Sequence, residues 1–146
     1  SSTSRGLGDV YKRQGIKYMD YGHKKVINGT IVDVENLLRE KLLNNGFGVI
    51  TEIDIKEKLE DKLGVDFRSY KILGSCHPPS AYESLNIDLN VGILLPCNFV
   101  VWDNKDGTTT VATIKASSLL SILKNSELNH VGEKVDKLVS SVMDQL

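Results

Sequence analysis

The sequence predicts an α+β protein in which an antiparallel β-sheet of about five strands packs with helices on one face. Two observations lead to this class. Predicted strands mostly follow one another along the chain, and amphipathic helices lie toward both ends. The helix expected at residues 127–146 is the longest, with apolar residues on one face: Val131, Val135, Leu138, Val139, Val142 and Leu146.

A single domain is expected to account for most of the chain. The 146 residues are 40% hydrophobic and 25% charged, which is typical of one globular domain with its own core. Residues 6–14, GLGDVYKRQ, resemble the translation of a transposon-end adapter used in sequencing libraries. We therefore assign residues 1–14 to a non-native, adapter-derived tail and residues 15–146 to the domain.

The first predicted strand, at residues 21–27, is followed by a helix. Thr30 and Asp33 form a plausible capping box at the helix start, and the Asn-Asn-Gly run at residues 44–46 ends the helix. Between these signals lies an apolar stripe expected to face the sheet: Ile31, Val34, Leu37, Leu38 and Leu42.

The next two elements are a strand and a short charged helix. Side chains alternate between two faces over residues 49–55, which predicts a strand. Residues 56–63 predict a helix in which Leu59 and Leu63 face the core, and Gly64 ends it.

Prolines interrupt the predicted elements in the following segment. Residues 70–76 predict a strand that Pro78-Pro79 stops, and Ser80 is expected to cap one or two helical turns. The most hydrophobic strand is expected at residues 92–102. It contains Pro96, which has no N–H to donate, so we expect an edge position or a β-bulge there.

The last part of the chain begins with a hairpin. Residues 104–107 form the expected turn, residues 108–114 are rich in β-branched side chains and form the returning strand, and residues 119–123 predict a short apolar helix.

Charge and cysteine content narrow the expected partners and location. Leaving out Arg5, Lys12, Arg13 and Asp9 of the tail changes the net charge from −1 to −3, which disfavours nucleic acid as a partner. No apolar run approaches the length of a membrane span, so we expect no membrane partner. Two cysteines are too few for a disulfide scaffold and favour a reducing, cytoplasmic location.

The two cysteines provide the main candidate site. Cys76 ends a strand in the segment YKILGSCHPP, where the turn and His77 can favour a reactive thiol, so Cys76 is the candidate catalytic residue. Cys97 follows Pro96 in the segment LLPCN, and Cys97 with Asn98 is a candidate for ligand binding at a pocket rim. The alternative for each cysteine is a small buried hydrophobe.

Neither a disulfide nor a metal site is expected. A simple antiparallel pairing of residues 70–76 with residues 92–102 places Cys76 opposite the start of the second strand and not opposite Cys97. No ligand spacing of the zinc kind occurs, so we predict no metal, and the sequence identifies no cofactor.

Glu52 is a further ligand-binding candidate because it shares a strand face with Asp54. Two nearby carboxylates can divide acid and base roles or bind a cation. The alternative is the solvated face of a half-buried strand, with Lys71 and Arg68 as ion-pair partners.

Four segments carry a resemblance to a known family: GFGVITEID, KLGVDF, YKILGSCHPP and GILLPCN. In order and spacing they resemble the domain of unknown function family 302 (DUF302), also called the TT1751-like superfamily, and the resemblance extends over residues 18–146. It implies a TATA-binding-protein-like topology in which a curved antiparallel sheet grips a long C-terminal helix. It also implies a small bacterial or archaeal protein whose biochemical role is unassigned.

Two departures limit what the resemblance implies for the site. His77 stands where family members usually have Asn, and Lys115-Ala116 stands where they often have an acid and a proline. The resemblance therefore assigns no chemistry to His77.

Three functional hypotheses remain open, and the sequence does not decide whether the protein is an enzyme. The leading one is a small-ligand-binding module whose pocket lies on the concave sheet face under the C-terminal helix. Its polar rim would contain the four candidate residues, Glu52, Cys76, Cys97 and Asn98. The alternatives are a thiol-based enzyme or redox sensor using Cys76, and a subunit that forms a homodimer.

Overall fold

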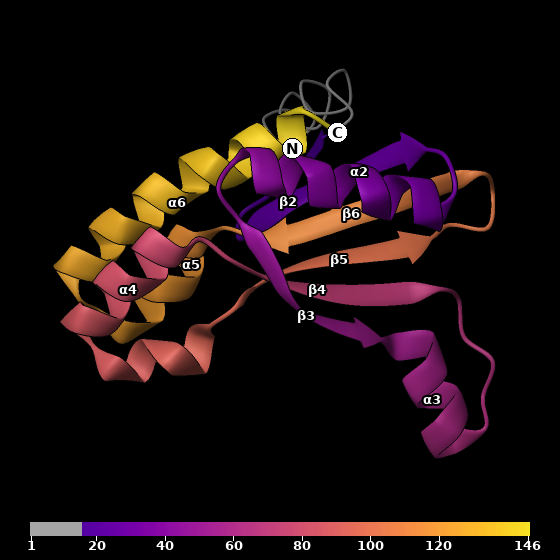
Figure 1. Ribbon diagram of the computed structural model, residues 1–146, viewed down its shortest axis with the longest axis horizontal. Coiled ribbons are helices and arrows are strands. Elements are labelled where there is room, and N and C mark those ends of the chain that lie inside the picture. Colours follow the sequence, from indigo (N-terminus) through magenta and orange to yellow (C-terminus); the bar gives the residue numbers. More distant parts are fainter. Residues whose placement is uncertain (1–15) are drawn as a thin grey trace, which may run out of the picture.

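A six-stranded antiparallel sheet forms the centre of the computed structural model, which describes residues 16–146, with side chains from residue 20 onward (Figure 1). The strand order is β1-β2-β6-β5-β4-β3, and every neighbouring pair is antiparallel. The strands are β1 (Ile16–Met19), β2 (Gly22–Asn28), β3 (Gly48–Asp54), β4 (Tyr70–Cys76), β5 (Cys97–Asp103) and β6 (Thr108–Ile114). The α+β class is confirmed, and β1 is an additional short strand. The proposed tail, residues 1–14, lies outside the described residues.

Helices cover one face of the sheet and gather at its two ends (Figure 1). The long helices α2 and α6 pack on one face, while α4, α5 and a 3₁₀ segment lie at one end and α3 at the other. The helical segments are α2 (Ile31–Asn44), α3 (Ile55–Leu63), α4 (Pro78–Ile87), η1 (Leu89–Leu94), α5 (Ala116–Leu120), η2 (Ser121–Leu123) and α6 (Ser126–Asp144).

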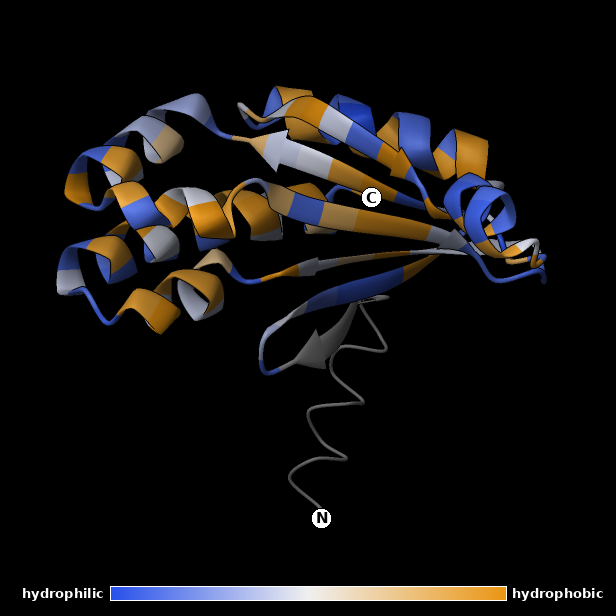
Figure 2. Cartoon of the chain, turned by 90° about the horizontal axis from the view of Figure 1, so that it is seen from below, coloured by the Kyte–Doolittle hydropathy of each residue, from blue (hydrophilic) through white to orange (hydrophobic). Residues whose placement is uncertain are grey.

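The core lies between the sheet and the two long helices. The apolar stripes predicted for α2 and α6 supply much of it, which confirms the helical periodicity (Figure 2). Fully buried side chains from the strands and from both helices meet there: Leu38, Leu42, Leu73, Phe99, Val101, Val111, Leu128 and Val142. Burying a side chain of this size contributes about 1.5–3 kcal/mol, so these contacts hold the two layers together.

The start of α2 and the end of α3 are capped as the sequence predicts. The Thr30 hydroxyl accepts a hydrogen bond from the Asp33 N–H at 3.2 Å and caps α2. Gly64 ends α3 with a left-handed φ of 65°, a conformation that glycine adopts without steric cost. Among the described residues, no helix combines the length and apolarity needed to cross a membrane.

The strand expected at residues 92–102 is wrong in its first part. Leu89–Leu94 forms the 3₁₀ helix η1, and β5 begins only at Cys97, after a cis Leu95–Pro96 peptide bond. Because β5 pairs with a strand on both sides, it cannot include a residue that lacks an N–H. The bulge lies instead in β3, where the register shifts between Val49 and Thr51.

Two smaller expectations are also wrong. Leu63 does not face the core: it is 68% exposed, because α3 lies at the end of the sheet and buries no residue. Ser80 does not cap α4, because the helix already begins at Pro78, with His77 at the N-cap position. Proline fits the first helical turn, where its missing N–H would have no partner within the helix.

Candidate functional site

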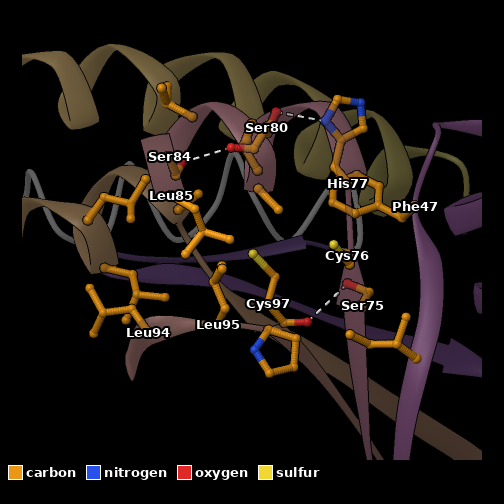
Figure 3. A pocket seen from close by; sticks show the side chains of 18 residues that line it. Phe47, Ser75, Cys76, His77, Ser80, Ser84, Leu85, Leu94, Leu95 and Cys97 are labelled. Carbon is orange, nitrogen blue, oxygen red and sulfur yellow. Dashed lines mark hydrogen bonds between the residues drawn. The ribbon is translucent and has the colours of Figure 1, made fainter. Parts of the chain in front are cut away.

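A cavity of about 360 Å³ lies at the end of the sheet where β4 and β5 meet α4, α5 and α6 (Figure 3). Most of its wall is apolar and comes from five parts of the fold: Phe47, Ile50, Ala81, Leu85, Leu94, Leu95, Pro96, Ala116, Leu119, Leu120, Val131 and Val135. Six smaller polar or sulfur-containing side chains complete it: Ser75, Cys76, His77, Ser80, Ser84 and Cys97. The cavity thus reaches α6, as expected, but it lies beyond the strand ends and not across the middle of the sheet.

Strand register brings both cysteines to this cavity. Ser75 of β4 pairs directly with Cys97 of β5, so Cys76 is one position away from the residue opposite Cys97. The Ser75 hydroxyl donates to the Cys97 carbonyl at 3.0 Å, which links the two strands at this point. The pairing expected from the sequence, with Cys76 opposite residue 92 and not opposite Cys97, is therefore wrong in its register, because the partner strand β5 starts at Cys97.

Gly74 allows Pro96 to approach β4 closely. A Cβ atom at position 74 would overlap the Thr51 hydroxyl and lie only 2.7 Å from the Cγ of Pro96. The glycine thus permits the contact through which the chain enters β5 directly before Cys97.

The Cys97 thiol resists ionisation. Burial raises its pKa to about 11, with smaller contributions from Cys76 and from the Asp136 carboxylate. A thiol loses its proton less readily where the resulting anion is poorly solvated. At neutral pH Cys97 is thus a neutral thiol, while both cysteines are free and half-buried.

A short hydrogen-bonded group lines the cavity beside the thiols. The Nδ1 of His77 lies 2.7 Å from the Ser80 hydroxyl, and the Ser84 hydroxyl donates to the Ser80 carbonyl at 2.8 Å. The Phe47 ring packs against the imidazole, with ring centroids 5.5 Å apart. The two serines were not among the predicted site residues; their spacing of four along α4 is the signal that places them on one helix face.

The other two candidates, Glu52 and Asn98, lie elsewhere. Asn98 is exposed and lines a separate open depression of about 540 Å³, here called the outer hollow, which also contains Lys24 and Trp102. Leu94, Leu95 and Pro96 form a wall common to this hollow and the cavity.

Glu52 belongs to an ion-pair network between β3, β4 and α2. Its carboxylate lies 2.9 Å from the Lys71 ammonium and 2.7 Å from the Arg39 guanidinium, and Lys71 also pairs with Glu35. The hydrogen bond from Lys71 is the main cause that lowers the pKa of Glu52. The structure therefore places Glu52 among charges, as in the alternative considered from the sequence, and away from the cavity.

Known proteins show similarity to this chain in sequence and in structure. The family model described as "Domain of unknown function DUF302" matches residues 23–146. The crystal structure of an uncharacterized conserved DUF302 protein from Bacillus stearothermophilus is similar, with a TM-score of 0.80 and 29% sequence identity, over 87% of this chain and 98% of that chain. A comparison with curated proteins gives no match.

Proposed function

The chain belongs to the DUF302 family, and on that premise we propose that the protein binds a small, mainly apolar molecule in the cavity beside Cys76 and Cys97. The observation that carries this proposal is the size and lining of the cavity. Protein cores normally contain few voids larger than a water molecule. A volume of about 360 Å³ lies within the range of roughly 300–1,000 Å³ found for ligand sites.

The lining favours an apolar ligand over a charged one. None of the described residues that line the cavity is an aspartate, glutamate, lysine or arginine. The serines and His77 already hydrogen-bond to one another or to the backbone, so they offer few free groups to a polar ligand. Burying a charge without a partner would cost far more than burying an alkyl or aromatic group.

A fluorescent apolar probe tests the proposal directly. We expect the uncharged probe N-phenyl-1-naphthylamine to bind the folded protein and the Ala81→Leu variant to bind it at least tenfold more weakly. Ala81 lines the cavity, and the larger side chain would occupy part of its volume. Fluorescence titration measures both affinities.

A matched control comes from the same helix. Asn86 of α4 is exposed and does not line the cavity, so Asn86→Leu adds a similar apolar side chain elsewhere and should leave probe affinity unchanged. Thermal unfolding monitored by circular dichroism establishes that both variants are folded. Equal probe binding by wild type and Ala81→Leu, or no binding by the wild type, would reject the proposal. If the probe results support the proposal, native mass spectrometry of protein purified from cells would identify the natural ligand.

Three further expectations stay proposals alongside this one. A thiol-based activity at Cys76 is supported by the second cysteine in the same cavity. A reducing, cytoplasmic location is supported by both cysteines being free. A homodimer is proposed as well, and sedimentation velocity over a range of concentrations would test it.

A further inference from the structure

The ends of β4 and β5 place two thiols within reach of each other. Ser75 pairs with Cys97, so Cys76 is its diagonal neighbour across the strand pair. A strand separation of about 4.8 Å and a rise of about 3.4 Å per residue put the two Cα atoms roughly 6 Å apart. Disulfides span Cα–Cα distances of about 4.4–6.8 Å, so the backbone already has the required spacing.

Side-chain direction supports the same conclusion. Alternation along a strand would send neighbouring side chains to opposite faces, but these two residues lie at the strand ends, and both line the cavity. Figure 3 shows both side chains reaching into this space, from β4 and from the start of β5. Both residues are half-buried.

We propose that Cys76 and Cys97 form a redox pair, which a low-molecular-weight disulfide converts into an intramolecular disulfide at the cavity wall. This pairing goes beyond ligand binding and does not require it.

The reaction proceeds by two thiol–disulfide exchanges. The Cys76 thiolate attacks one sulfur of the small disulfide RSSR; a Cys76–SR bond forms, the S–S bond of RSSR breaks, and RS⁻ leaves and takes up a proton. Cys97 then loses its proton to solvent and attacks the Cys76 sulfur, releasing the second RS⁻. Overall the two cysteines lose two protons and two electrons, and one RSSR becomes two RSH.

The order of attack follows from the different surroundings of the two residues. Cys97 is a neutral thiol at neutral pH because burial raises its pKa to about 11, which makes it a poor first nucleophile. Once Cys76 carries the mixed disulfide, Cys97 is held beside the sulfur that it must attack. We therefore assign the first step to Cys76 and the resolving step to Cys97.

The disulfide would also restrain part of the cavity wall. The segment between the two cysteines contains α4 and η1, and both contribute residues to the cavity: Ser80, Ala81, Ser84, Leu85 and Leu94. Joining Cys76 to Cys97 ties the two ends of this segment together. An effect of oxidation on ligand binding would follow from this restraint, and that consequence alone rests on the proposed function.

Intact-mass analysis after incubation with glutathione disulfide tests the proposal. We expect the wild-type monomer to lose two hydrogens and to retain no glutathione. The Cys97→Ser variant should retain one glutathione on Cys76, because no resolving thiol remains. The Cys76→Ser variant should stay unmodified over the same time.

Each contrary result has a definite meaning. The proposed redox pair would be wrong if the wild type stayed reduced in excess glutathione disulfide or kept the mixed disulfide. It would also be wrong if the wild type formed only intermolecular disulfides on a non-reducing gel. Rapid glutathionylation of Cys76→Ser overturns the assigned order. Circular dichroism of both serine variants shows whether they are folded, which separates these outcomes from misfolding. Probe binding by the reduced wild type tests the ligand-binding proposal separately from the redox pair.

Discussion

Cys97 illustrates how burial, more than sequence neighbours, sets the chemistry of a side chain. Its position after a proline suggests a thiol at a pocket rim, and it does line a cavity. Yet the same apolar wall that forms the cavity removes water from the thiolate and raises the pKa to about 11. Contact with a ligand and reactivity as a nucleophile are therefore separate properties at this residue.

Alkylation against pH tests this difference. In Cys76→Ser, Cys97 is the only cysteine of the chain, so iodoacetamide reports on it alone. We expect the rate to reach half of its maximum near pH 11, because the thiolate is the reacting form and burial is the largest cause of the shift. At pH 8 the reaction should be roughly 200-fold slower than that of a solvent-exposed thiol.

The unfolded variant provides the control for this experiment. In urea, Cys97 loses its buried surroundings, and its half-maximal rate should fall near pH 8.5, the value for a free cysteine. Circular dichroism at each pH confirms that the folded sample stays folded. Equal pH profiles for the folded and unfolded protein would contradict the effect of burial.

Glu52 and Asn98 show that a sequence pattern does not reveal which tertiary neighbours a side chain has. Alternation along a strand indicates which side chains share a face, but it does not say which elements stand opposite that face. Glu52 meets Lys71, as considered from the sequence, and Arg39, which comes from α2. Asn98 follows Cys97 directly and therefore faces away from the cavity, into the outer hollow. Of the four residues predicted to form one pocket rim, only the two cysteines line the same cavity.

At the scale of elements, the close approach of β4 to Pro96 sets the position of β5. Gly74→Ala is expected to lower the free energy of unfolding by about 1–3 kcal/mol, because the new methyl group overlaps Thr51 and presses on Pro96. Urea unfolding followed by circular dichroism measures the change.

Gly48→Ala is the matched control, since Gly48 lies on the neighbouring strand β3 and a Cβ there meets no atom within 4 Å. Its free energy of unfolding should stay within about 0.5 kcal/mol of the wild type. If both substitutions had the same effect, the loss would come from strand propensity and not from the contact with Pro96.

Elements with strong local signals could be predicted from the sequence, and those set by tertiary surroundings could not. The bounds of β4 and the caps at Thr30 and Gly64 depend on local chemistry, and the structure confirms them. Leu94 and Leu95 contribute to the core and to the cavity, whereas Ile93 is 82% exposed. In the sequence, this apolar run looks like a buried strand. Because an apolar run can be either a strand or a helical segment, the sequence did not predict that β5 starts at Cys97. For the same reason it did not predict the pairing that brings the two cysteines close together.

At the scale of the whole molecule, we predict from charge and surface chemistry that the protein does not bind nucleic acid. The net charge is −1, and the outer hollow on the sheet contains one basic side chain, Lys24, among the residues that line it. The Lys24 ammonium lies 5.3 Å from the centre of the Trp102 ring, which also stacks with Tyr70. The aromatic group that could stack on a base thus already has neighbours from its own chain.

Fluorescence anisotropy with labelled duplex DNA and single-stranded RNA checks this expectation. We expect no binding at low ionic strength, where phosphate contacts would be strongest. Binding that weakens steeply as salt is added would contradict the prediction.

The wall formed by Leu94, Leu95 and Pro96 has one further consequence. It faces the cavity of about 360 Å³ on one side and the outer hollow of about 540 Å³ on the other. Leu94 and Leu95 also pack against the core, which holds this wall in place. A larger side chain at one of these positions would therefore take volume from both spaces, so a single substitution would alter the cavity and the outer hollow together.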